Sequence, residues 1–182
     1  MATYTVFMSS NMASTRYAER IFDCVATEDI ENGTFGYLNG LADGETNIYN
    51  FKKGTKSGET VVVADQPVWT ENTSLTSNQR RDKFIIEAGT KFRVRVIKKN
   101  DEFGITIEGV TVATQDKFDV GAYATIDATT GKLVASETAP SASAVMGVIV
   151  EHKDKMGGTL VTTAHNYGYS RVMYNCRVIT LA

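Results

Sequence analysis

Hydrophobic and polar positions alternate along much of the chain with the period of a β-strand. In residues 90–98, Phe92, Val94 and Val96 alternate with basic side chains. Such alternation predicts a strand in a sheet that has one face buried and the other in water. Residues 103–108 repeat the pattern after a polar turn at 100–102, so the two segments are predicted to form a hairpin.

Turn residues separate further segments of the same kind. Asn32-Gly33 favours a tight turn, because both central positions of such a turn need positive φ, and residues 34–38 are therefore predicted to run back beside 20–26. The loop 128–131 lies between two more predicted strands, 122–127 and 132–135, and indicates a second hairpin. Strands are also expected at 47–51, 60–65, 145–151, 159–164 and 172–181.

The pattern leaves little room for helix. Residues 12–20 and 74–82 are the two windows that could hold a short one, and the second has too few apolar residues to dock firmly, so it is predicted as an exposed loop. The predicted fold class is all-β, an antiparallel barrel or sandwich built from hairpins with an extended N-terminal arm. Residues 1–19 are predicted to form the arm, and residues 20–182 a β-rich domain of one unit or two lobes.

Composition and charge argue against several classes of function. Of the 182 residues, 42% are hydrophobic and 22% are charged, as in ordinary globular proteins. The net charge of −2 and the short basic clusters argue against nucleic-acid binding, which depends on extended contacts to phosphates. No apolar run is long enough to span a membrane, so no membrane partner is expected. The N-terminus lacks the pattern of a signal peptide, and synthesis and use in a cytoplasm are expected.

Reactive side chains are few and scattered. Cys24 and Cys176 lie far apart in the sequence and are interpreted either as a disulfide or as two small buried apolar residues. His152 and His165 are also separate, so no zinc site is expected. The glycines of the segment 33–40 are interpreted as turn and packing residues rather than as a phosphate-binding loop. The sequence therefore predicts no catalytic residues, no metal, no cofactor and no enzymatic activity.

Two groups of side chains are candidates for contact with a partner. The first group could line a sugar-binding or protein-binding surface, although tyrosines on strand faces are also common at the edges of cores; it consists of Tyr167, Tyr169 and Tyr174, with Asn166 and Asn175. A glycan-binding sandwich would use Trp69 together with Tyr167 and Tyr169. The apolar segment 4–8 is either the first strand of the fold or an arm that pairs with the sheet edge of a neighbouring molecule. The second alternative makes its large side chains candidate contact residues: Tyr4, Val6, Phe7 and Met8.

Three stretches are similar to the strands and turns of small phage head proteins. They are residues 31–38 (ENGTFGYL), 86–94 (IEAGTKFRV), and 119–127 (DVGAYATID) with 131–133 and 145–151 after it. Over roughly residues 20–155 the chain resembles the capsid decoration, or cement, proteins of tailed bacteriophages. The likeness lies in the composition and in the spacing of strands and turns, not in an invariant motif. The C-terminal part, 159–182, matches least, and the chain is longer than the smallest members of that family.

The resemblance implies a virion structural protein, made in the host cytoplasm and located on the capsid surface. Such a protein binds the outside of the expanded capsid, often as a homotrimer, and clamps neighbouring subunits of the major capsid protein. An N-terminal segment often supplies the contact, so removal of residues 1–12 is expected to leave the domain folded and to abolish capsid binding. The alternatives are a tail-tube or baseplate protein of a phage, and a glycan-binding β-sandwich.

Overall fold

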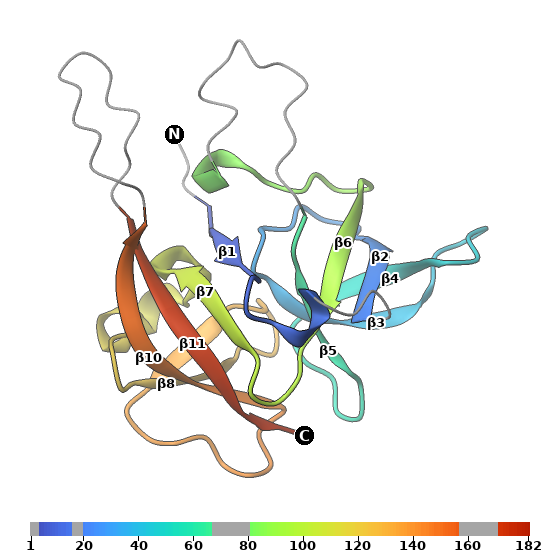
Figure 1. Ribbon diagram of the computed structural model, residues 1–182. Helices are drawn as coiled ribbons and strands as arrows, with labels where there is room; N and C mark the ends of the chain where they lie inside the picture. Colours follow the sequence, from blue (N-terminus) through green and yellow to red (C-terminus); the bar gives the residue numbers. More distant parts are fainter. Residues whose placement is uncertain (1–3, 16–19, 67–80, 157–170) are drawn as a thin grey trace, which may run out of the picture.

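The computed structural model describes residues 4–15, 20–66, 81–156 and 171–182. It is mostly β, with 45% strand and 10% helix, which confirms the predicted all-β class. The strands form two units that lie side by side, a closed barrel and an open sheet (Figure 1).

The barrel contains five strands in the order β2-β4-β3-β5-β6. All neighbouring strands are antiparallel except β2 and β4, which are parallel. Closure of the barrel leaves none of its strands at an edge, and an edge would otherwise expose unpaired main-chain groups. The strands are β2 (Ile21–Val25), β3 (Phe35–Leu41), β4 (Ile48–Lys53), β5 (Val61–Ala64) and β6 (Lys91–Val96).

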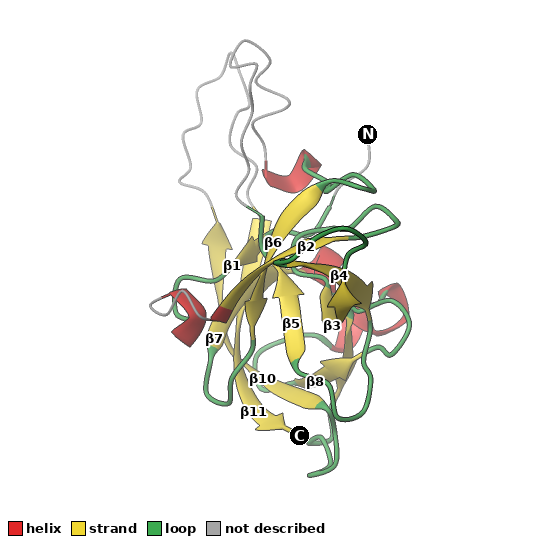
Figure 2. Cartoon of the chain, turned by 90° about the vertical axis from the view of Figure 1, so that its right-hand side faces the viewer, coloured by secondary structure: helices red, strands yellow, loops and turns green. Residues whose placement is uncertain are grey.

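The open sheet contains six strands in the order β1-β7-β11-β10-β8-β9, all antiparallel. They are β1 (Phe7–Met8), β7 (Glu102–Thr106), β8 (Tyr123–Ile126), β9 (Leu133–Ser136), β10 (Met146–Met156) and β11 (Arg171–Leu181). Figure 2 shows the short helices at the margins of the two units, and those of the described residues are 3₁₀ helices: η1 (Ala13–Thr15), η4 (Arg81–Lys83), η5 (Ile107–Gly109) and η6 (Val112–Lys117).

Two hydrophobic cores hold these strands together, and β5 contributes to both. Val62 and Ala64 belong to the core inside the barrel. Val61 and Val63 belong to a second core, which the barrel shares with the open sheet. Since successive side chains of a strand point to opposite faces, a strand between two cores must be apolar at every position. This explains why all four residues of β5 are buried.

The predicted hairpin of residues 90–98 and 103–108 is wrong. Strand β6 pairs with β2 and β5 in the barrel, whereas β7 pairs with β1 and β11 in the open sheet. The intervening turn carries the chain from one unit to the other. Asp101, which is 3% exposed, accepts hydrogen bonds from the main-chain N–H of Lys98 (2.8 Å) and Ala13 (2.9 Å), and these bonds fix the crossover.

The predicted pairing of residues 20–26 with 34–38 is also wrong. Gly33 has the positive φ expected of the turn (81°), but β2 pairs with β4 and β6 and not with β3. The predicted hairpin around residues 128–131 is confirmed, because β8 and β9 pair from Tyr123–Ser136 to Ile126–Leu133. The predicted strand 159–164 and most of the window 74–82 lie outside the described residues.

Candidate contact surface

The four predicted contact residues occupy different positions in the structure. Val6 and Phe7 are buried, with 1% and 6% of their surface exposed, whereas Tyr4 and Met8 are half-buried. Of the two alternatives for this segment, the structure shows the first: β1 is a strand of the chain's own open sheet, paired with β7. Only Tyr4 and Met8 of the four have side-chain surface that another molecule can reach.

Phe7 lies where the barrel and the open sheet meet. Its ring centroid is 6.4 Å from that of Phe35 on the barrel strand β3 and 5.4 Å from that of Phe103 on β7. The rings of Phe35 and Phe103 are themselves 5.6 Å apart. Phe7 therefore completes an aromatic cluster to which both units contribute.

Polar contacts also attach the segment 4–15 to both units. Val6 donates its N–H to the hydroxyl of Thr106 in β7 (3.1 Å) and accepts the N–H of Thr106 (3.1 Å). On the barrel side, the hydroxyl of Ser9 donates to Asp65 (2.6 Å), and Asp65 also pairs with Arg95 of β6. The N-terminal segment is thus bonded to the open sheet and the barrel at once.

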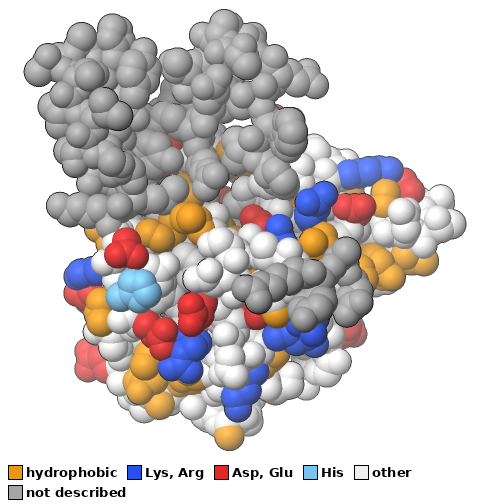
Figure 3. Space-filling model, viewed as in Figure 1, with side chains coloured by type: hydrophobic (Ala, Val, Ile, Leu, Met, Phe, Trp, Pro, Cys, Tyr) orange, Lys and Arg blue, Asp and Glu red, His pale blue; other side chains and the backbone are white. Residues whose placement is uncertain are grey.

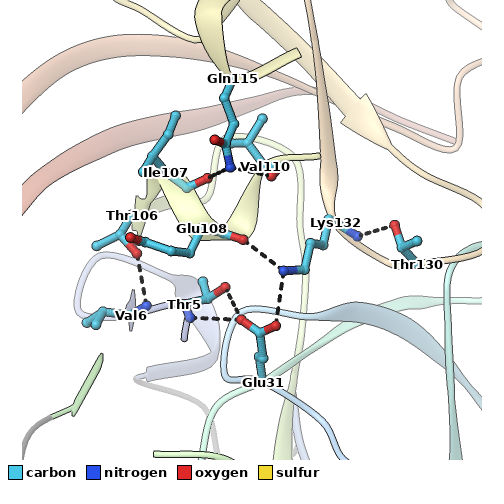
Figure 4. A network of polar contacts seen from close by, with 10 residues as sticks. All are labelled: Thr5, Val6, Glu31, Thr106, Ile107, Glu108, Val110, Gln115, Thr130 and Lys132. Carbon is cyan, nitrogen blue, oxygen red and sulfur yellow. Dashed lines mark hydrogen bonds and ion pairs between the residues drawn. The ribbon is translucent and has the colours of Figure 1, made fainter. Parts of the chain in front are cut away.

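The carboxylate of Glu31, in the connection between β2 and β3, contacts both the N-terminal segment and the β8–β9 loop (Figure 4). Glu31 accepts hydrogen bonds from the N–H and the hydroxyl of Thr5 at 2.9 and 2.7 Å. Its second oxygen lies 3.0 Å from the Nζ of Lys132, which also donates to the carbonyl of Glu108 at 2.9 Å. Residues from four distant places in the sequence meet here, and no local motif marks them.

Replacement of Glu31 by glutamine is expected to lower the free energy of unfolding by about 1–2 kcal/mol, because charge-assisted hydrogen bonds are worth more than neutral ones and the partners are partly buried. Urea denaturation followed by circular dichroism measures the change. Glu59→Gln is the matched control, since the one ion pair of Glu59 among the described residues is the exposed pair with Lys56. Equal effects of the two substitutions would show that the Glu31 contacts add nothing to stability.

Polar side chains of β7, β10 and β11 line part of the surface of the open sheet. A hollow of about 210 Å³ lies on it, lined by Asn11, Glu102, Phe103, Glu151, His152, Asp154, Asn175 and Cys176. Charged side chains of both signs and a histidine gather on this side of the molecule (Figure 3). The acids have partners: Arg177 pairs with Glu151 (2.6 Å), and Asn175 donates to Asp154 (2.7 Å). In the part of the chain that the structure describes, no group of three or more His, Cys, Asp or Glu side chains is placed so that it could bind a metal ion.

The two cysteines are free and buried, so they are the small buried apolar residues of the second interpretation and not a disulfide. Cys24 lies in the barrel core and Cys176 in the shared core, so they are not paired. Burial raises the pKa of Cys24 to about 12, with a further contribution from the nearby charge of Asp23. Burial also raises the pKa of Cys176, assisted by Glu151. Since the thiolate is the reactive form, neither thiol is suited to nucleophilic chemistry in this state.

Of the residues proposed for a sugar-binding or protein-binding surface, the structure describes Tyr174 and Asn175. Tyr174 is half-buried against the shared core, with its ring centroid 5.0 Å from that of Phe118, and the side chain of Asn175 donates to Asp154. Trp69, Tyr167 and Tyr169 lie outside the described residues, as does His165. His152 is exposed, and its Nε2 lies 3.5 Å from Asp154.

Comparison with known proteins assigns no family to the chain. It matches no protein-family model, no curated protein and no solved structure. Among the helices of the described residues, none has the length and apolar character needed to cross a membrane.

Proposed function

We propose that this chain is a capsid decoration protein of a tailed bacteriophage. In this role it binds the outer surface of the capsid, as a homotrimer, and stabilises the shell by clamping neighbouring major capsid protein subunits. The resemblance of its strands and turns to phage head proteins supports the proposal. The structural observation that carries it is the fusion of the barrel and the open sheet into one body with a common core.

A clamp between subunits must transmit force without bending at an internal joint. Units joined by small polar interfaces usually move relative to each other. Here Phe35, Val61 and Val63 of the barrel pack in the same core as strands of the open sheet. The N-terminal segment adds hydrogen bonds to both units, through Thr106 on one side and Asp65 on the other. We therefore expect the two units to behave as one rigid body, as a protein that holds capsid subunits together requires.

Tyr4 and Met8 remain the contact candidates, because part of each side chain is accessible while its neighbours anchor the segment. We expect the double substitution Tyr4→Ala and Met8→Ala to weaken capsid binding about tenfold or more, as loss of a central apolar contact does in other interfaces. Leu41→Ala is the matched control, since Leu41 is 48% exposed and lies on the barrel strand β3 rather than on the N-terminal segment. Binding is measured by cosedimentation with expanded capsids that lack a decoration protein.

The control particles are unexpanded shells of the same phage. Saturable binding of the unsubstituted protein to expanded shells alone supports the decoration role and gives the number of copies per capsid. Absence of binding to both kinds of shell, with rings or tubes of the free protein, would instead assign it to the tail. Equal loss of binding in the Leu41 control would remove Tyr4 and Met8 as contact residues without deciding the role itself.

A further inference from the structure

The chain contains two Asn-Gly pairs, Asn32-Gly33 and Asn39-Gly40. In such a pair the main-chain nitrogen of glycine can attack the side-chain carbonyl carbon of asparagine, because glycine has no side chain to hinder the approach and is conformationally free. The reaction needs the asparagine amide to turn toward that nitrogen. Two identical dipeptides seven positions apart therefore differ in reactivity only through the structure around them.

The structure holds Asn32-Gly33 in an unreactive arrangement. Asn32 is 8% exposed, and both ends of its amide are bonded to the main chain of Gln66: Nδ2 donates to the carbonyl and Oδ1 accepts the N–H, each at 2.9 Å. The attacking atom is also engaged, because the N–H of Gly33 donates to the carbonyl of Ala64 at 2.8 Å. Reaction at this site requires these bonds to break together.

Asn39-Gly40 has none of this protection. Both residues are exposed, and they lie in an irregularity of the β3–β4 ladder, where the register passes from Leu38–Phe51 directly to Leu41–Tyr49. Gly40 has a φ of 74°, and no atom lies within 4 Å of the position that a Cβ would take. Within the described residues the side chain of Asn39 has no hydrogen-bond partner, so its amide can rotate freely.

We propose that Asn39 is a site of spontaneous deamidation in the folded protein and that Asn32 is not. The nitrogen of Gly40 forms a bond to Cγ of Asn39 after losing its proton, and the side-chain nitrogen leaves with that proton as ammonia. Water then opens the resulting succinimide at one of its two carbonyl carbons. The products are aspartate and isoaspartate, in which the main chain continues through the side-chain carbon.

The modification changes the β3–β4 hairpin in two ways. It adds one negative charge, which takes the formal net charge from −2 to −3. The isoaspartate product also lengthens the main chain by one carbon at a place where the ladder is already irregular. Because both residues lack register partners, the barrel accommodates the product without loss of strand pairing.

The test is incubation of the native protein in mildly alkaline buffer, followed by tryptic digestion and tandem mass spectrometry. Residues 21–52 contain both pairs and no internal lysine or arginine, so one peptide reports both sites under identical conditions. Deamidation at Asn39 is expected to be at least about tenfold faster than at Asn32, in line with the protection that native hydrogen bonds give. In denaturant the two rates are expected to become similar.

The variant Asn39→Gln supplies the control, because glutamine forms the corresponding ring much more slowly. This variant is expected to lose the acidic species that anion-exchange chromatography separates from the native protein, whereas Asn32→Gln is expected to retain it. Similar rates at the two sites in the native protein would overturn the proposal. So would absence of reaction at Asn39 in the native protein when the denatured chain reacts at both sites.

Discussion

Replacement of Phe7 by alanine is expected to lower the free energy of unfolding by about 3–5 kcal/mol. The ring is 6% exposed and contacts Phe35 of the barrel and Phe103 of the open sheet. Its removal leaves a cavity between two units that cannot close without moving one against the other. Since domains are stable by only about 5–15 kcal/mol, the loss is a large fraction of the total.

Urea denaturation followed by circular dichroism measures this effect. Met8→Ala is the matched control, because Met8 is the other residue of β1 and is only half-buried. Its substitution is expected to lower the free energy of unfolding by about 1 kcal/mol, the typical effect of a point substitution. A Phe7→Ala protein as stable as the control would show that the aromatic cluster does not join the two units.

The contacts of the N-terminal segment also determine what removal of residues 1–12 would do. The sequence led us to expect that removal of residues 1–12 leaves the domain folded. The structure makes this deletion equivalent to loss of Val6, Phe7 and the buried Met12 from the core, together with the bonds to Glu31 and Thr106. We now expect the truncated chain to be strongly destabilised, so the capsid-binding test uses Tyr4 and Met8 substitutions in the full chain instead.

Replacement of Gly54 by alanine is expected to have the second large effect. Gly54 directly follows β4 of the barrel, and a Cβ at this position would lie 1.9 Å from the carbonyl oxygen of Ala128, in the β8–β9 loop of the open sheet. A main-chain oxygen cannot move aside as a flexible side chain can. Alanine must therefore push the loop away from the barrel, and this collision is expected to lower the free energy of unfolding by about 1–3 kcal/mol, as overpacking does elsewhere. The φ of 92° at Gly54 adds the strain of a left-handed residue, about 1–2 kcal/mol, to this cost.

Gly58 in the same connection provides the control for backbone strain. Its φ is 80°, close to the 92° of Gly54, but no atom lies within 4 Å of its Cβ position. Gly58→Ala therefore adds the strain of a left-handed residue, about 1–2 kcal/mol, without the collision. The difference between the two variants in thermal or urea denaturation isolates the contact between the units. Equal stabilities of the Gly54→Ala and Gly58→Ala proteins would mean that the β8–β9 loop moves away from the barrel without a loss of free energy.

Much of the local structure could be predicted from the sequence. Apolar residues in strand-like patterns predicted strands in both units, and the loop at 128–131 predicted the hairpin of β8 and β9. Both predictions depend only on residues that are neighbours in the sequence. The continuous apolar run in β5 was recognised as a strand, but its position between two cores was not. Burial on both faces of β5 depends on what packs there, and the sequence of the strand does not contain that information.

Which strands pair was decided by the tertiary structure. Residues 90–98 and 103–108 have matching patterns and a short turn between them, yet they belong to different units, because their main-chain partners lie elsewhere in the sequence: β6 pairs with β2 and β5, and β7 pairs with β1 and β11. The contacts of Glu31 with Thr5 and Lys132 bring together residues 26 and 101 positions apart, which no spacing rule could indicate. The same holds for the two Asn-Gly pairs: the sequence makes both chemically reactive, and only the folded surroundings protect one of them.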